Sequence, residues 1–239
     1  MVQLSEIDEA RSFLRQHGWL ASTTTAFANT LLSHSTLRAV ERGECVYEVG
    51  EQPDGLYGVF SGSFAIEIAP HERGPNLAHV IGPGFWFGNG ELFDRRPRFA
   101  SFIATRPSVC VHVSLDALTK LAADEPEIWR WIGLLTSQQL ILALGVIDDA
   151  SLRDPSTRVS ALLLRLADAR SPDVPREPQP EIDVTQEDLS LLTALSRATV
   201  AAHLYKLENA GLISRAYRRL KLLDPDALRK RVAQQWRDV

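Results

Sequence analysis

Residues 184–213 read VTQEDLSLLTALSRATVAAHLYKLENAGLI, and this stretch decides how the C-terminal part of the chain folds. Thr185 and Asp188 have the spacing of a capping box, which indicates that a helix begins there. Ser196 is a typical N-cap residue for a second helix, and apolar residues follow it every three or four positions. The stretch therefore predicts two short helices joined by a tight turn.

The residues after these two helices predict a wing. A basic turn within residues 214–223 separates two short strand-like runs. Two helices with a short turn occur in many proteins, so a helical hairpin with a solvated polar face is the simpler alternative. The basic hairpin favours DNA binding, because arginine forks match guanine edges and hydroxyl groups suit phosphate oxygens. The expected DNA contacts are Thr185, Gln186, Ser196, Arg197, Thr199, His203, Arg215, Arg218 and Arg219.

Residues 37–113 predict an antiparallel β domain. Short runs rich in β-branched and aromatic residues alternate with glycine-containing turns. Strands with turn signals at intervals of roughly 8–12 residues are typical of a sandwich or barrel. The helical pattern before them, broken near Gly18, is expected to serve as packing only.

Residues 126–152 predict a long helix that is apolar on two sides. One stripe alternates spacings of four and three, the pattern of a helix–helix seam, with a polar residue in its middle. A second stripe, which includes Trp131, Leu134 and Ile141, fits packing on the β domain. A homodimer would supply a partner for the first stripe, whereas a buried monomer helix is the alternative. The expected dimer-interface residues are Ile128, Ile132, Leu135, Gln139, Leu142 and Val146.

The whole pattern resembles the catabolite activator protein and fumarate–nitrate regulator (Crp/Fnr) superfamily of bacterial transcription factors. The resemblance centres on residues 196–200, SRATV, and covers nearly the whole chain. It implies an α+β fold with a β-roll effector domain like a cyclic-nucleotide-binding domain (1–125), a dimerisation helix (126–153) and a winged helix-turn-helix (154–239). It further implies a homodimer on a palindromic operator in double-stranded DNA, with Arg197 reading a base and RNA polymerase as a further candidate partner.

Three alanines depart from this family pattern in the helix-turn-helix. Ala194 stands where the family's turn usually carries glycine, and an alanine held at positive φ costs on the order of 1 kcal/mol. Ala198 replaces the acidic residue that often follows the reading arginine. Ala202 replaces a second arginine of the best-known member. DNA binding therefore carries over, but the best-known operator sequence does not.

The resemblance places an effector pocket at residues 84–100. Cyclic-nucleotide binders of the family have Gly-Glu here and Arg-Ser about ten residues later, which hold the ribose hydroxyl and the cyclic phosphate. In this chain, Gly88 and Arg98 match, but Asn89 stands at the glutamate position and Phe99 at the serine position, while Glu91 lies two residues further on. The helix positions that would meet the adenine, Ala143 and Leu144, also lack a hydroxyl group. The candidate pocket residues are Trp86, Phe87, Gly88, Asn89, Glu91, Arg98 and Phe99.

Three interpretations of this pocket follow. A retained cyclic-nucleotide site is the least favoured. In the second, Arg98 is a structural ion-pair residue and the pocket is degenerate or filled. In the third, a more apolar ligand contacts Trp86, Phe87 and Phe99. The sequence alone therefore leaves the effector unidentified.

The chain has 239 residues, which are enough for two compact domains. Its charged residues are distributed unevenly between the two ends. The net charge is −4, but residues 182–239 hold ten Lys and Arg against seven Asp and Glu, so this end carries +3 and the rest carries −7. Such an asymmetry fits a DNA-binding end attached to an acidic sensor domain.

Other chemistry finds little support in the sequence. Two cysteines indicate a reducing compartment and are too few for a four-thiolate iron–sulfur cluster. Cys110 and His112 share one strand face, so a haem or metal site is an alternative to a core cysteine beside a half-buried histidine. No signal peptide or catalytic motif appears, and the apolar run Leu140–Ile147 is far shorter than a membrane span. We expect a cytoplasmic protein that is not an enzyme and has no membrane segment, cofactor or metal.

Two rival functions stay open at this point. One is a ligand- or protein-binding sensor module with weak DNA affinity, and the other is a regulator that depends on haem or a cyclic nucleotide. Replacing Arg197 with alanine distinguishes the first from a DNA reader, because only a reader loses base preference.

Overall fold

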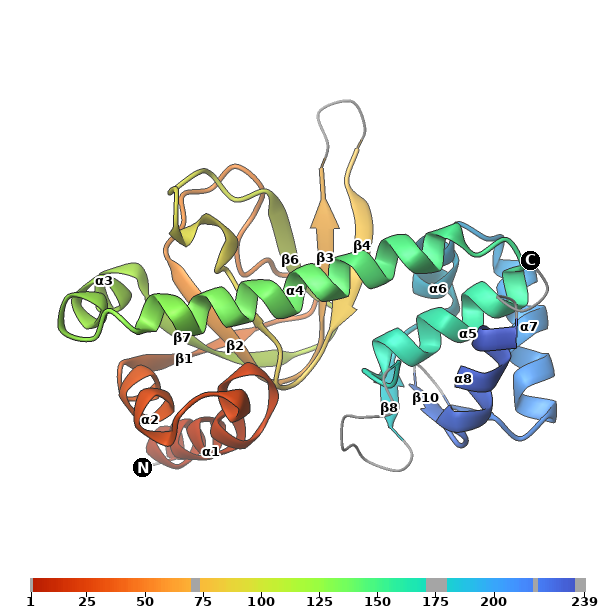
Figure 1. The fold of residues 1–239 in the computed structure, drawn as a ribbon, viewed down its shortest axis with the longest axis horizontal. Helices are drawn as coiled ribbons and strands as arrows, with labels where there is room; N and C mark the ends of the chain where they lie inside the picture. The colour runs from red at the N-terminus through yellow and green to blue at the C-terminus, as the bar shows by residue number, and fades with distance from the viewer. Residues whose placement is uncertain (1, 70–73, 171–179, 217–218, 235–239) are drawn as a thin grey trace. The chain divides into compact units, whose positions relative to one another are not determined.

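The computed structural model describes residues 2–69, 74–170, 180–216 and 219–234 (Figure 1). The chain divides into two compact units, Met1–Leu140 and Ile141–Val239. The boundary lies inside the long helix α4 (Ile128–Ser151), so the two halves of this helix belong to different units.

The first unit begins with three short helical segments, α1 (Val2–Gln16), η1 (Gly18–Ser22) and α2 (Thr25–Ser33). The predicted break falls at Gly18, where the backbone has a φ of +68°. Thr24 caps α2 by accepting from the N–H of Phe27 at 3.2 Å.

Within the described part of the first unit, seven strands form two antiparallel sheets (Figure 1). The four-stranded sheet has the order β1-β7-β2-β5, and the three-stranded sheet has the order β4-β3-β6. Their bounds are β1 (Ser35–Val40), β2 (Gly55–Ser61), β3 (Phe64–Ile68), β4 (Asn76–Ile81), β5 (Trp86–Phe87), β6 (Ala100–Ala104) and β7 (Ser108–Ser114). The short helix η2 (Gly90–Leu92) follows β5.

Strand alternation gives the four-stranded sheet two apolar faces. On β2, Leu56 joins the core beneath the N-terminal helices, whereas Tyr57 and Val59 join the core between the two sheets. Gly58 lies against Trp86, and a β-carbon added at Gly58 would come within 2.7 Å of the indole ring atoms. A larger residue at this position would therefore displace the indole.

The first half of α4 completes the helical side of this unit. After α3 (Leu115–Asp124), Ile128, Ile132 and Leu135 of α4 enter the core with α1, η1 and α2. The indole N–H of Trp19 donates to the carbonyl of Trp131 at 2.8 Å. These contacts join α4 to the N-terminal helices.

Helix α4 is long and apolar enough to cross a membrane. The sequence had predicted no membrane segment, because the apolar run Leu140–Ile147 alone is too short. This is weak evidence by itself, because helices of soluble proteins pass the same test. Only 17% of an 18-residue apolar stretch of this helix is buried within the chain. The chain itself therefore leaves most of this apolar stretch uncovered, and the proposed function has to account for that surface.

The second unit holds a small sheet and the two predicted short helices. The sheet has the order β8-β10-β9, and the predicted hairpin is present as β9 and β10. The bounds are α5 (Pro155–Leu166), β8 (Glu181–Asp183), α6 (Gln186–Thr193), α7 (Arg197–Asn209), β9 (Ile213–Ala216), β10 (Arg219–Leu222) and α8 (Pro225–Gln234). Residues 171–179 and Trp236 lie outside the described residues.

Buried ion pairs join the end of α4 to α5. Asp149 accepts from Arg165 at 2.8 Å, with both side chains 5% exposed, and it also pairs with Arg170 at 3.0 Å. Arg158 donates to the carbonyl of Leu152 from two nitrogens. The elbow around Pro155 is therefore bridged by side chains on both of its sides.

Candidate effector pocket and DNA-binding surface

Arg98 is the buried centre of the predicted pocket, with a side chain that is 0% exposed. Its Nη1 donates to the carbonyl of Gly88 and to Glu91 Oε2, each at 3.0 Å. Its Nη2 donates to Asp54 Oδ1 at 2.7 Å and to the carbonyl of Gly55 at 3.1 Å. Acceptors from the chain itself therefore hold both terminal nitrogens of the guanidinium.

Glu91 uses both of its carboxylate oxygens inside this pocket, and its side chain is 6% exposed. Oε2 accepts from Arg98, and Oε1 accepts from the backbone N–H of Phe99 at 3.2 Å. A guanidinium beside a backbone N–H is a donor set that binds anions such as phosphate and carboxylate. Glu91 thus fills an anion site formed by Arg98 and the next backbone N–H.

Asp54 links Arg98 to the four-stranded sheet. The hydroxyl of Tyr57 donates to Asp54 Oδ2, and Arg38 donates to that hydroxyl at 3.2 Å. Burial opposes ionisation of Asp54, but the hydrogen bonds from Tyr57 and Arg98 outweigh it and lower the pKa of the carboxyl. Burial also opposes the charge on Arg98, but Tyr47 and the two carboxylates outweigh it and raise the pKa of the guanidinium. The group therefore stays charged.

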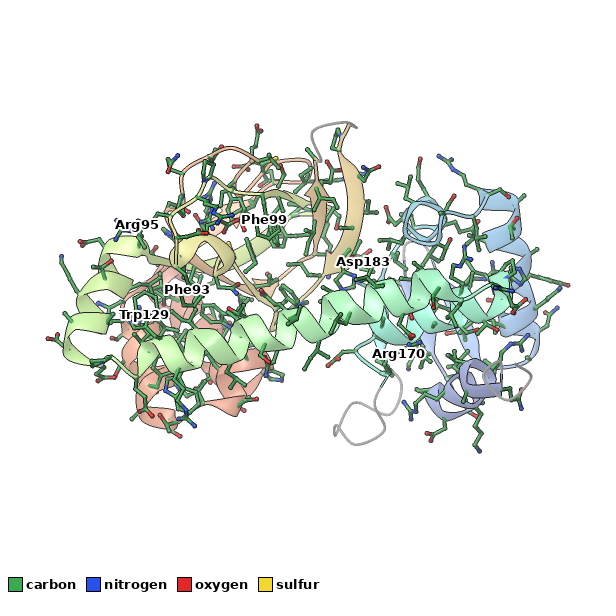
Figure 2. The ribbon with its side chains drawn as sticks, turned by 45° about the horizontal axis from the view of Figure 1, so that its top comes forward. Phe93, Arg95, Phe99, Trp129, Arg170 and Asp183 are labelled. Atoms are coloured by element: carbon green, nitrogen blue, oxygen red, sulfur yellow. The ribbon has the colours of Figure 1, made fainter. Side chains whose placement is uncertain are left out.

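Two of the aromatic pocket residues belong to the core instead. Trp86 packs with the N-terminal helices, whereas Phe87 packs between the two sheets, where its ring stacks on Phe102 at 4.2 Å. The prediction that they face one ligand site was wrong, because neighbouring residues on a strand point to opposite faces. Phe99 is 66% exposed, and its ring lies against Gly90 (Figure 2).

Asn89, which stands at the family's glutamate position, is buried and donates to the hydroxyl of Thr136 on α4 at 3.1 Å. Gln139 on the same helix donates to the carbonyl of Trp86 at 2.7 Å. Strand β5 and the residue that precedes η2 are therefore both bonded to the first half of α4. The sequence did not indicate either partner.

Cys110 and His112 share a strand face as predicted, and each has a protein partner. Burial raises the pKa of the Cys110 thiol to about 12, and its Sγ lies 3.7 Å from the carbonyl of Arg38. The His112 ring stacks on Tyr57 with centroids 4.4 Å apart, and burial lowers the pKa of this imidazole despite nearby Asp54. Among the described residues, no three His, Cys, Asp or Glu side chains gather as a metal would require.

In the second unit, local hydrogen bonds fix the start of both short helices. Thr185 and Asp188 form the predicted capping box, with both reciprocal bonds present. Ser196 caps α7 by accepting from the N–H of Thr199 at 3.1 Å. Between them, Ala194 has φ +54° and ψ +33°, the left-handed conformation that usually calls for glycine. The turn therefore has the conformation that glycine favours, and the alanine bears the strain.

Arg197 is the first residue of α7, and its side chain is 66% exposed. Its Nη2 donates to Oε1 of Glu187, which lies in the first turn of α6 and has a side chain 58% exposed. Both charged groups are thus held at one exposed place, at the N-terminal ends of the two helices. The sequence identified Arg197 but not its partner.

The remaining predicted DNA contacts differ in their exposure and in whether their polar groups already have partners in the chain. Gln186 and Ser196 are exposed, whereas the hydroxyls of Thr185 and Thr199 already bond to Asp188 and Ser196. His203 is half-buried near the apolar stripe of α7, and burial and Lys206 lower the pKa of this imidazole. Its position in the helix, three residues after Val200 and four before Leu207, accounts for this partial burial.

The wing arginines also carry carboxylate partners. Arg215 on β9 is held by Glu208 at the end of α7, with Nε 2.9 Å from Oε2, and this bond lowers the pKa of Glu208. Arg219 on β10 pairs with Glu181 at 3.2 Å and has a side chain 60% exposed. Arg218 lies outside the described residues. The pairing of Arg215 favours a role in joining the wing to α7.

One exposed aromatic residue on α7 was not among the predicted DNA contacts. Tyr205 is 60% exposed and shares a helix face with Ala198 and Ala202, which lie seven and three residues before it. This spacing is visible in the sequence, but an uncharged side chain gives no electrostatic signal of DNA binding. A phenol hydroxyl is a common donor to phosphate oxygens.

Known proteins resemble both units of this chain. Residues 37–125 match the cyclic nucleotide-binding domain, and residues 157–231 match the Crp-like helix-turn-helix domain. The chain is 29% identical over 190 residues to the CRP-like cAMP-activated global transcriptional regulator of Mycobacterium tuberculosis, covering 80% of this chain and 85% of that protein.

The chain belongs to the Crp/Fnr family of transcription regulators. It is therefore a DNA-binding transcription regulator of a family that is not enzymatic. Two solved structures share this fold. FixK2 of Bradyrhizobium japonicum gives a TM-score of 0.69 at 18% identity, covering 84% of this chain and 96% of its own. The c-di-GMP responsive regulator CLP of Xanthomonas campestris gives 0.61 at 23% identity, covering 83% and 99%.

Crp/Fnr proteins are typically dimeric, and the dimer interface was predicted on α4. Three of the predicted interface residues, Ile128, Ile132 and Leu135, are at most 3% exposed and lie in the core of the first unit. Gln139 bonds to Trp86, and Leu142 and Val146 are half-buried. The predicted seam therefore includes residues that their own chain already covers. The exposed apolar residues of α4 are instead Trp129, Leu140, Ile141, Leu144 and Ile147.

Proposed function

We propose that this protein is a homodimeric, cytoplasmic Crp/Fnr regulator that binds a palindromic operator without needing a cyclic nucleotide. The observation that carries the proposal is the position of Glu91. Its carboxylate takes the guanidinium of Arg98 and the N–H of Phe99, the donors that a cyclic phosphate would need. The pocket thus contains its own anion.

A cyclic phosphate entering this site would have to displace two carboxylates from a buried arginine. Breaking a buried ion pair by removing one partner costs on the order of 3–5 kcal/mol, because the other charge is left without compensation. A nucleotide could recover part of this cost only by placing its own charge between Arg98 and Phe99. Glu91 and Asp54 would then be left near that charge, and like charges repel.

The relative from M. tuberculosis is described as cAMP-activated, so cyclic AMP is the ligand to test first. We would titrate cyclic AMP and cyclic GMP into the purified protein by calorimetry, and measure DNA binding without any nucleotide. We expect no saturable heat and retained operator binding. Saturable micromolar binding that also tightens DNA binding would overturn this proposal.

A Glu91→Ala variant sharpens this experiment. Removing the internal carboxylate vacates the donors of Arg98 and Phe99, so the variant should bind a cyclic nucleotide or inorganic phosphate more tightly than the unmodified chain. Glu187→Ala, which removes a carboxylate in the other unit, is the matched control and should leave nucleotide binding unchanged. If Glu91→Ala gains nothing, Glu91 is not what keeps the anion site filled.

Dimerisation is proposed to use the exposed stripe of α4. Leu140, Leu144 and Ile147 are 55–66% exposed and follow spacings of four and three, the pattern of a parallel helix seam. Trp129 continues the stripe eleven residues earlier, where its ring contacts Phe93 with centroids 5.7 Å apart (Figure 2). A second copy of the chain would cover this apolar surface.

A membrane is a poorer partner for α4, because its other side is already packed. Ile128, Ile132 and Leu135 contact the protein core, and Asp149 is buried in ion pairs with Arg165 and Arg170. Insertion into a bilayer would break these contacts and place a charged group in hydrocarbon, which costs several kcal/mol.

Leu144→Glu tests the dimer seam. A carboxylate in the centre of an apolar interface should weaken dimerisation by about 2 kcal/mol, or roughly 30-fold. Gln138→Glu is the matched control, since Gln138 is exposed on the same helix but away from the stripe. Sedimentation would show the difference, and equal dimer dissociation for both variants would count against the seam.

A further inference from the structure

The ion pair between Glu187 and Arg197 contributes little to folding. Both side chains are more than half exposed, at 58% and 66%. Exposed pairs contribute about 0–1 kcal/mol to stability, because water and salt screen them. Its two residues nevertheless bridge the two helices of the DNA-binding motif at their N-terminal ends. Stability alone gives no reason for this arrangement.

The location of Arg197 is unfavourable for a cation. It is the first residue of α7, where the helix dipole places partial positive charge. No acidic residue lies in the first turn of α7, so the helix itself offers no compensation. Glu187 supplies the missing negative charge from α6. It thereby holds the arginine at a helix end that disfavours it.

Two acidic residues lie next to each other at the start of α6, and only Glu187 has a carboxylate that can pair with Arg197. Asp188 is bonded to the N–H and the hydroxyl of Thr185 at 2.8 and 2.7 Å, so its carboxylate is committed to the capping box. Glu187 is the other acidic residue of this first turn. The two carboxylates thus have separate roles, one in folding the helix and one on the exposed surface.

The pair leaves Arg197 able to read a base. A guanidinium carries five N–H donors, and the bond to Glu187 uses only one of the two on Nη2. Nη2 keeps its second N–H, which forms a parallel fork with an N–H of Nη1 or of Nε and so suffices for the two acceptors of guanine, O6 and N7. Because Glu187 fixes one corner of the guanidinium, it limits the orientations that the remaining donors sample.

We propose that Glu187 is a positioning residue for base recognition, which orients Arg197 toward guanine and keeps it from binding phosphates at random. This inference rests on the proposed operator binding by α7. In the free protein the carboxylate neutralises the arginine, so non-specific contact with the DNA backbone gains little. On the operator, the same bond presents the arginine to one base pair.

The test begins by selecting operator sequences from a random pool of double-stranded DNA with the unmodified protein. Arg197→Ala then identifies the base position that Arg197 reads, as the position at which preference is lost. Duplexes with and without guanine at that position are compared for Glu187→Ala, Glu187→Gln and Glu181→Ala, at two salt concentrations. Glu181 is the matched control, since it is an exposed glutamate of the same unit paired with a different arginine.

Glu187→Ala should reduce the preference for guanine at that position by about tenfold, within the range that one bidentate arginine provides. Its affinity for non-specific DNA should rise, and the salt dependence should steepen by about one phosphate contact. Glu187→Gln keeps an oxygen acceptor for Arg197, so it should restore the guanine preference while sharing the rise in non-specific affinity. Glu181→Ala should leave the preference unchanged.

Three results would overturn the inference. Glu187→Ala could retain the guanine preference within about twofold of that of the unmodified protein, or Glu181→Ala could reduce it equally, which would indicate a general charge effect. If the unmodified protein enriches no sequence at all, the proposed operator binding fails together with the inference. If the unmodified protein enriches a sequence but the Glu187 variants keep its guanine preference, only the role of Glu187 is refuted and operator binding stands.

Discussion

Arg98 and Arg197 have opposite environments, although family resemblance marks both as ligand-binding arginines. The side chain of Arg98 is 0% exposed and bonds to two carboxylates and two carbonyls. The side chain of Arg197 is 66% exposed and has one carboxylate partner. A buried charge must keep its partners, whereas an exposed charge can exchange them for a ligand. The comparison therefore separates an arginine used for structure from one available for recognition.

The largest expected effect comes from removing the buried arginine. Arg98→Ala would leave Glu91 and Asp54 without their counter-ion, so the free energy of unfolding should fall by about 3–5 kcal/mol. Arg96→Ala is the control, because Arg96 pairs with Asp94 at 2.7 Å but is 80% exposed, and it should cost at most about 1 kcal/mol. Denaturant unfolding measures both, and equal losses would break the comparison.

Removing the exposed arginine should change stability little and DNA binding strongly. Arg197→Ala should change the free energy of unfolding by no more than about 0.5 kcal/mol. Its operator affinity should fall by about 1–3 kcal/mol, with preference relaxed at one base pair. Competition binding on selected DNA gives the second quantity. A large loss of stability without loss of base preference would place Arg197 with the structural arginines.

Local features of the helix-turn-helix were predictable because their causes lie within a few residues. The capping box of Thr185 and Asp188 and the cap at Ser196 are short-range hydrogen bonds that spacing alone identifies. The partners of the arginines were not predictable in this way. Asp54 lies 44 residues from Arg98, and Glu187 lies on a different helix from Arg197. Such pairs depend on how elements pack.

The dimer seam shows a second limit of the sequence. The long helix has apolar residues on more than one side, and periodicity cannot say which side packs inside the chain. The structure places Ile128, Ile132 and Leu135 in the core, while Leu140, Leu144 and Ile147 are exposed. Similarly, adjacent Trp86 and Phe87 were expected to share a pocket, although a strand turns them to opposite faces.

A smaller effect concerns the turn that places Arg197. Ala194 has φ +54°, so Ala194→Gly should relieve backbone strain and raise the free energy of unfolding by about 0.5–1 kcal/mol. Ala202→Gly is the matched control, since it is exposed inside α7 and should lower stability by about 1 kcal/mol. Opposite signs in thermal unfolding would confirm the strain, whereas two losses would show that Ala194 is not strained.

The smallest effect concerns Asp54, whose side chain is 47% exposed and lies between the two extremes. Burial opposes its charge, but Tyr57 and Arg98 lower its pKa in the folded protein below the unfolded value of about 3.9. The stability gained from this ionised carboxylate is therefore present above that value and is lost as pH falls through the lower folded pKa. Asp54→Asn lacks this dependence, so the difference in Tm between the two proteins should be constant from neutral pH to about pH 5 and shrink below about pH 4. If the difference does not change with pH, the charge on Asp54 is not what stabilises Arg98, and Glu91 must supply most of the compensation.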